Sequence, residues 1–157
     1  MATLTKTLFS FDYPEFKGEM CEGGWTWVPC PTWSNPTRTC KQSYQVPCKK
    51  TRTSKFRVYV DLTYPASVEE FIRKEIERCH QIGALAAGKI IYGAATASSV
   101  VGPEATIAAA IGAIPLAAKT YGEVFWNCLQ SLNLADALKR QINGSIKHDT
   151  HKINDWH

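Results

Sequence analysis

The residues of this chain most able to do chemistry are its six cysteines. Their number is even, the chain is small, and no two of them form a CxxC pair. This pattern is typical of disulfide bonds rather than of a zinc site, because cysteine zinc ligands usually come in closely spaced pairs. The sequence therefore predicts disulfide bonds and an oxidising destination for the protein.

No catalytic motif accompanies the cysteines. The sequence has no GxSxG elbow, no phosphate-binding glycine loop and no HExxH motif. His80 follows Cys79, but successive helical side chains point about 100° apart, so adjacency does not make a Cys/His dyad. The other histidines lie in the polar tail, residues 147–157, which is expected to be a frayed terminus. We therefore expect a protein that is not an enzyme and holds no metal or cofactor.

The most unusual stretch is residues 82–118, in which only Lys89 and Glu104 are charged. At its centre, Gly102 suits the left-handed position just after a helix end, and Pro103 suits the first turn of a new helix. We therefore predict an antiparallel helical hairpin that turns at Gly102.

This hairpin would bring two cysteines side by side. Cys79 lies 23 residues before Gly102 and Cys128 lies 26 residues after it, so the two sit at nearly the same height. We predict that Cys79 and Cys128 form a disulfide that ties the hairpin roots together. The remaining cysteines are expected to pair within the N-terminal part, in an order that spacing does not decide: Cys21, Cys30, Cys40 and Cys48.

The first hairpin arm can be compared with a bilayer, whose hydrocarbon core takes about 20 apolar helical residues to cross. Residues 82–101 just reach that length, but Lys89 offsets the transfer free energy of the few strongly apolar side chains. Small residues four apart, such as Ala84 and Gly88, allow close helix packing in a membrane or in a protein core. An alanine-rich core hairpin is therefore the alternative to insertion into a target membrane. The candidate membrane-insertion residues are Ile82, Leu85, Gly88, Ile90, Ile91, Gly93, Val100, Val101, Ile107, Ile111 and Ile114.

The N-terminal part is expected to form a small antiparallel sheet. Residues 3–13 alternate well enough for a strand that Pro14 ends, and the turn residues between positions 21 and 40 allow only short strands. Residues 54–64 alternate cleanly and give the most secure strand. Three tryptophans could form an aromatic surface for a sugar or a lipid headgroup, or the core of the small sheet: Trp25, Trp27 and Trp33.

One basic cluster follows the last cysteine of this part. Its position suggests either attraction to a polyanion or a solvated hairpin turn. The candidate polyanion-binding residues are Lys49, Lys50, Arg52, Lys55 and Arg57. An anionic lipid surface is the favoured partner, a glycan is a second one, and nucleic acid is not expected.

Composition changes near Tyr64-Pro65. The chain carries a formal net charge of +4. Its basic excess falls in the first 65 residues, where nine Lys and Arg face five Asp and Glu, against nine and nine in the remainder. We therefore expect an α+β protein with a cysteine-rich β domain over residues 1–65 and a helical hairpin domain with a polar tail over residues 66–157. The hairpin domain is expected to open with Ser67 as the helix N-cap and to include a short last helix over residues 134–142.

These features favour a membrane-active, toxin-like protein that is soluble when made and inserts its hairpin into a target membrane. In composition, the hairpin is similar to the apolar hairpins of pore-forming bacteriocins and to the Ala/Gly-rich segments of fusion peptides. The alternatives are a self-assembling structural protein whose oligomer interface is formed by the small-residue helical faces, and a polyanion or carbohydrate-binding module. We also expect the protein to form a homo-oligomer. No secretory signal peptide is recognised, so we expect secretion by another route or association with a target membrane.

Overall fold

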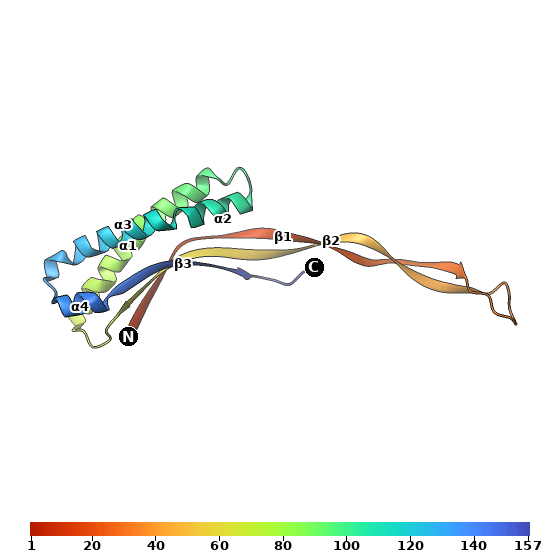
Figure 1. Ribbon diagram of the computed structural model, residues 1–157, viewed down its shortest axis with the longest axis horizontal. Coiled ribbons are helices and arrows are strands. Elements are labelled where there is room, and N and C mark those ends of the chain that lie inside the picture. The colour runs from red at the N-terminus through yellow and green to blue at the C-terminus, as the bar shows by residue number, and fades with distance from the viewer. The chain divides into compact units, whose positions relative to one another are not determined.

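The computed structural model describes residues 1–157, and the fold belongs to the α+β class, as expected. Three antiparallel strands form one sheet in the order β1-β2-β3, so β2 is the central strand (Figure 1). The strands are β1 (Ala2–Pro29), β2 (Thr39–Tyr64) and β3 (Asn143–Lys152). The helices are α1 (Glu70–Ala97), α2 (Pro103–Gly112), α3 (Ile114–Leu129), the short 3₁₀ turn η1 (Gln130–Leu132) and α4 (Asp136–Gln141).

The chain forms two compact units. Unit 1 comprises residues 1–13 and 55–151, and unit 2 comprises residues 14–54 and 152–157. This division differs from the expected one at Tyr64-Pro65. The reason is that the apolar residues of β1 and β2 within unit 1 share a core with the helices.

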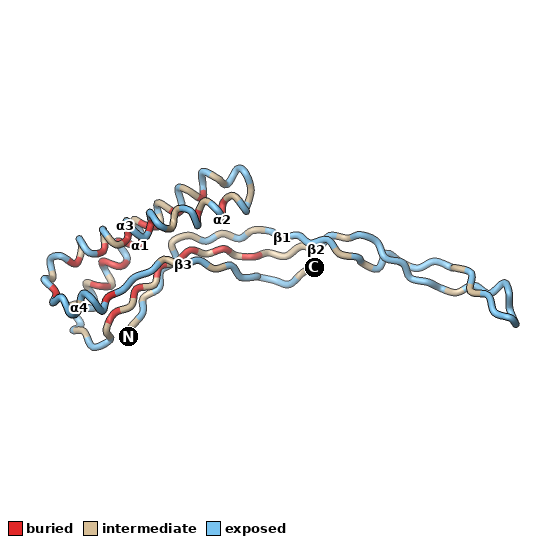
Figure 2. Tube along the Cα trace, in the orientation of Figure 1, coloured by how far each residue is buried: buried red, intermediate tan, exposed pale blue.

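The core of unit 1 is built on β2. Phe56, Val58 and Val60 are fully buried, whereas Lys55, Arg57 and Tyr59 between them are only partly buried. Strand side chains alternate between the two faces of a sheet, so every second residue points at the helices. Figure 2 shows the buried positions along β2 and on the helices of unit 1. The alternation expected for residues 54–64 is confirmed.

Helix α1 begins at Glu70, and its N-cap is Glu69 without a side-chain capping bond. The expected capping box at Ser67 is therefore wrong. Residues 65–68 instead form a turn in which the Val68 N–H donates to the Pro65 carbonyl over 3.4 Å. The helix then continues through three glycines without a break to Ala97.

Two of these glycines lie at close contacts. A Cβ on Gly83 would lie 2.9 Å from Cδ2 of Tyr121 on α3, and one on Gly88 would lie 3.3 Å from the Leu8 carbonyl oxygen on β1. Both distances are tighter than ordinary van der Waals contact. The glycines therefore lower helix propensity but allow α3 and β1 to approach α1 closely.

Strand β3 corrects the expectation of a frayed polar tail. Its backbone pairs with β2, and Ile146 packs against the core of unit 1. Arg57 donates to both carboxylate oxygens of Asp149, at 3.2 and 2.6 Å, and the pKa of Asp149 is lowered mainly by this hydrogen bonding. The tail lacks an apolar alternation because polar side chains make contacts on both of its faces: His148 lies beside the Phe56 ring, whereas Asp149 binds Arg57 on the opposite face. Its strand character therefore depends on pairing with β2 rather than on sequence pattern.

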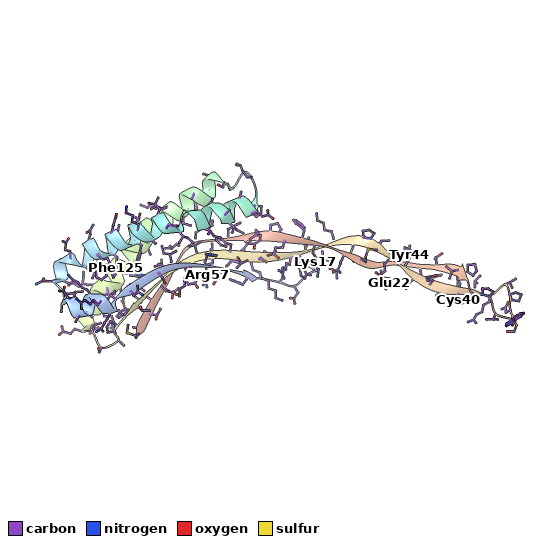
Figure 3. The ribbon with its side chains drawn as sticks, in the orientation of Figure 1. Lys17, Glu22, Cys40, Tyr44, Arg57 and Phe125 are labelled. Atoms are coloured by element: carbon purple, nitrogen blue, oxygen red, sulfur yellow. A yellow bond between two sulfur atoms is a disulfide. The ribbon has the colours of Figure 1, made fainter.

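Unit 2 is a long two-stranded ribbon without a buried hydrophobic residue. The expectations that Pro14 ends the first strand and that residues 21–40 hold only short strands are wrong, because β1 runs from Ala2 to Pro29. β1 lies at the edge of the sheet, where proline is tolerated. Within the ribbon, a Cβ on Gly23 would lie 2.7 Å from Val46, and Gly24 has a φ of 132° beside the ring of Tyr44. Figure 3 labels Tyr44 on β2.

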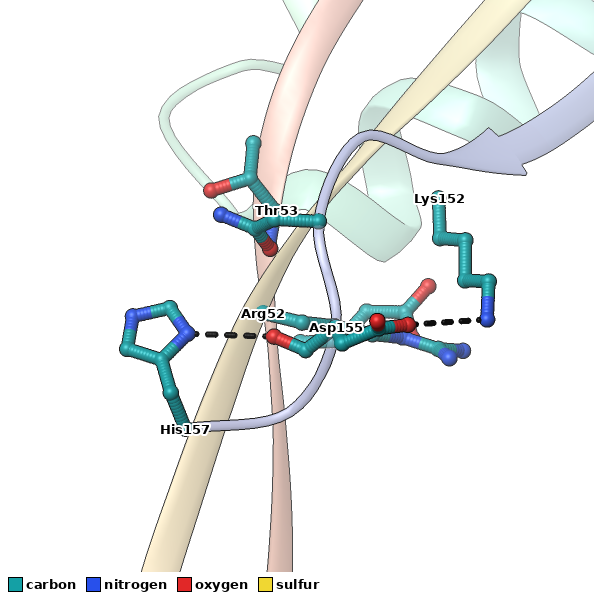
Figure 4. A network of polar contacts seen from close by, with 7 residues as sticks. Arg52, Thr53, Lys152, Asp155 and His157 are labelled. Carbon is teal, nitrogen blue, oxygen red and sulfur yellow. Dashed lines mark hydrogen bonds and ion pairs between the residues drawn. The ribbon is translucent and has the colours of Figure 1, made fainter.

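The end of the chain pairs with the β2 residues of unit 2. Thr51 and His157 exchange two backbone hydrogen bonds of 3.0 Å, and the Ile153 N–H donates to the Thr53 carbonyl over 2.8 Å. Lys152 contacts Asp155 over 3.0 Å, and the His157 ring bonds the Asp155 carbonyl oxygen over 3.1 Å (Figure 4). Unit 2 is therefore held by backbone pairing and small polar contacts rather than by a core.

Candidate functional site

None of the helices is both long enough and apolar enough to cross a membrane. The side chains of the predicted membrane-insertion residues differ widely in exposure.

Several predicted membrane-insertion residues belong to the interior of unit 1. Ile91 is fully buried, and Ile90, Ile107 and Ile114 pack against the core. Gly88 lies against β1, as described above. The hydrophobicity of these residues is thus used largely for folding, which sequence composition alone could not distinguish from membrane affinity.

The exposed members of the set concentrate at the turn between α1 and α2 and on one side of α1. Val100 and Val101 are 90% and 77% exposed, and Leu85 is 65% exposed. Ile82 and Ile111 are exposed to a smaller degree, and Gly93 has open space around it. The turn is therefore the part of the predicted hairpin that offers apolar side chains to solvent.

Hydrogen bonds fix the backbone of this turn. The Val101 N–H donates to the Ser98 carbonyl over 3.2 Å, and the Ser99 hydroxyl donates to the Thr96 carbonyl over 2.8 Å. Gly102 has a φ of 136°, and its carbonyl accepts from both the backbone N–H and the hydroxyl of Thr106 at 3.1 Å. Two adjacent valines are thus held outward on an ordered turn rather than on a loose loop.

The other end of the helices is tied covalently. Cys79 on α1 and Cys128 on α3 form a disulfide with their Cα atoms 5.5 Å apart, the pairing expected from the sequence. In unit 2, Cys21 pairs with Cys48 and Cys30 with Cys40. Glu19 lies beside the Cys21–Cys48 pair, but disulfide sulfurs are not the thiolates that bind a metal.

A buried polar pair adjoins the Cys79–Cys128 disulfide. His80 Nδ1 lies 2.7 Å from the Tyr121 hydroxyl, and His80 Nε2 is buried without a hydrogen-bond partner. Burial lowers the pKa of His80 and raises that of Tyr121. Lys6 further disfavours protonation of His80, whereas Asp61 favours it. No role for His80 was predicted, because Tyr121 lies 41 residues away along the chain.

The predicted polyanion-binding residues are divided between the two units and are largely paired. Lys50 contacts Glu19 over 2.6 Å, and Arg52 contacts Glu15 over 2.7 Å. Lys49 lies over the ring of Phe16, and Arg57 binds Asp149. Carboxylates of neighbouring strands therefore pair with three of the five basic residues, whereas Lys49 and Lys55 form no ion pair. Counting charges along the chain does not detect this pairing.

The three predicted surface tryptophans are all exposed in unit 2. Trp25 and Trp27 lie edge to face with ring centroids 5.5 Å apart, and the Lys41 ammonium lies 4.2 Å from the centroid of Trp25. Trp33 is fully exposed on the loop that the Cys30–Cys40 disulfide closes. Of the three, only Trp33 has both ring faces free of a recorded aromatic or cation contact.

No protein-family model, curated protein or solved structure matches this chain.

The three disulfides indicate a secreted or extracellular protein. The expectation that it is not an enzyme stays a prediction.

Proposed function

We propose that this protein is membrane-active and that unit 1 binds a lipid bilayer through the turn between α1 and α2. The observation that carries the proposal is the exposure of Val100 and Val101 on an ordered turn. No charged residue occurs between Lys89 and Glu104. Glu104, in the first turn of α2, is the charged residue nearest to the turn, so entry of the valines into the headgroup region brings one carboxylate with it.

The free energy available from this turn sets the mode of binding. Transferring a valine side chain from water to an apolar medium contributes about 1.5 to 3 kcal/mol, so two valines contribute roughly 3 to 6 kcal/mol. Reversible binding at the depth of an interfacial helix, about 5–10 Å, fits this amount better than a full crossing. Stable association then requires a second lipid contact or several copies of the protein on one membrane.

The test is binding to liposomes and leakage of a trapped dye. We expect Val100→Asp and Val101→Asp each to weaken partitioning by at least about tenfold, because an aspartate is costly to bring into the bilayer. Ile153→Asp introduces the same charge at an exposed position of unit 2 and is the matched control. Wild-type protein that does not sediment with liposomes, or valine variants that bind as well as wild type, would refute the proposal.

A second candidate function is glycan binding by unit 2, favoured by the exposure of Trp33 on a loop closed by a disulfide. Such a ring can stack on a sugar at little cost in conformational entropy. Trp33→Ala should abolish glycan binding, whereas Trp25→Ala, whose ring is already covered by Lys41, should have a smaller effect. Equal losses in both variants, or no glycan binding, would exclude this function for the loop.

Self-assembly, the remaining candidate, is separated from both by light scattering in the absence of lipid and glycan. A discrete oligomer under those conditions would favour it.

A further inference from the structure

A groove of about 470 Å³ lies between β1 and α1 in unit 1. β1 contributes Lys6, Thr7 and Leu8, and α1 contributes residues between Gln81 and Tyr92. That part of α1 extends roughly 16 Å at the rise of an α-helix. The volume falls in the range of small-molecule sites.

The floor of the groove is shaped by small residues. Ala84 and Gly88 of α1 both line it, and Gly88 lies so close to Leu8 that even a methyl group there would crowd the Leu8 carbonyl at 3.3 Å. The helix and the strand thus come together at this level. Bulky side chains are displaced to the sides of the groove.

The walls are apolar and partly open to solvent, although Leu8 also packs against the core and Tyr92 contacts the ring of Phe9 edge to face. Leu85 and Tyr92, seven residues apart on one side of α1, are 65% and 61% exposed. Leu8 on the opposite wall is only partly buried. A flexible hydrocarbon chain would bury these three side chains together.

The charge of the groove has one sign. Lys6 and Lys89 are its only charged residues, and neither takes part in an ion pair. Lys89 follows Gly88, and Lys6 lies two residues, or about 7 Å of strand, from Leu8. Both ammonium groups can therefore reach one anion at the level of the Gly88–Leu8 contact. This distinguishes them from Lys50, Arg52 and Arg57, which already bind carboxylates.

We propose that this groove binds an anionic lipid, with one acyl chain along Leu8, Leu85 and Tyr92 and the phosphate between Lys6 and Lys89. The biological role of the site rests on the proposed membrane activity, for which it supplies the second lipid contact. Its existence can be tested without a bilayer, so failure of the two proposals is distinguishable.

The experiment uses the full chain and dodecyl phosphate at concentrations where it is monomeric. Calorimetry should give saturable binding, and backbone NMR signals of residues 6–8 and 84–89 should shift together. Inorganic phosphate, which lacks the chain, and dodecanol, which lacks the charge, should each bind at least tenfold more weakly. Shifts elsewhere, or equal binding of either control compound, would overturn the proposal.

Substitutions separate the two halves of the ligand. Lys6→Gln and Lys89→Gln should each weaken dodecyl phosphate about fivefold, the usual effect of one basic residue near a lipid anion. Lys119→Gln, at an exposed lysine of α3 outside the groove, is the control and should bind like wild type. Leu85→Ser should weaken binding, and Leu116→Ser, at another exposed leucine, should not. If Lys6→Gln and Lys89→Gln both bind like wild type, the site does not exist as described.

Discussion

At the scale of single residues, the buried histidine His80 should make the stability of unit 1 depend on pH. It is buried, its Nε2 has no partner, and its pKa in the folded protein is lowered. His80 then binds a proton more readily in the unfolded chain than in the folded one. Its contribution to the free energy of unfolding is therefore constant above the unfolded pKa of about 6.5 and falls as the pH drops below that value. The free energy of unfolding of unit 1 should thus decrease in mildly acidic solution.

This is measured by urea unfolding between about pH 5 and 8, a window around the histidine reference value. We expect His80→Gln to flatten the dependence, because the amide can accept from Tyr121 but does not titrate. His157→Gln, at an exposed histidine of unit 2, should keep the wild-type slope. A His80→Gln profile as steep as wild type would show that another group is responsible.

The two glycines of α1 that differ most in their surroundings give a second residue-scale prediction. Gly83→Ala should destabilise unit 1 by about 1–3 kcal/mol, because the new methyl group would meet the ring of Tyr121, which His80 holds in place. Gly93→Ala meets no atom within 4 Å and should stabilise by about 0.5–1 kcal/mol through helix propensity. The test is to measure the free energy of unfolding of both variants. Changes of the same sign in the two variants would contradict the prediction.

At the scale of elements, the sequence predicted the helices and strands that are specified by residues close together in the chain. The alternation of residues 54–64 and the proline at the start of α2 are local signals, and both are observed. β3 and the length of β1 were missed because their strand character depends on a partner strand far along the chain. The groove was missed for the same reason, since Lys6 and Lys89 line one groove only when β1 packs on α1.

The Cys79–Cys128 disulfide gives a prediction for the helices. It closes a loop with a sequence separation of 49, whereas Cys30–Cys40 closes one of 10. On the chain-entropy estimate, removing the first by a double Cys→Ala substitution should cost about 4 kcal/mol and removing the second about 3 kcal/mol. The first substitution should lower the free energy of unfolding of unit 1, which contains Cys79 and Cys128. The second should lower that of unit 2, which contains Cys30 and Cys40.

At the scale of the whole molecule, two units with different sources of stability should unfold separately. Unit 1 has a hydrophobic core, whereas unit 2 has two disulfides and no buried hydrophobic residue. Calorimetry should resolve two transitions, and a reducing agent should abolish that of unit 2 before that of unit 1. A single transition that shifts as a whole on reduction would show that the units unfold together.

The pairing of β3 with β2 also fixes when unit 1 can finish folding. During synthesis, β2 and the helices leave the ribosome while the β2 edge that β3 later covers has no partner. Arg57 is synthesised 92 residues before its partner Asp149. An unpaired central strand is a template for association with other chains, so the nascent protein passes through an aggregation-prone interval that closes only when residues 143–152 emerge.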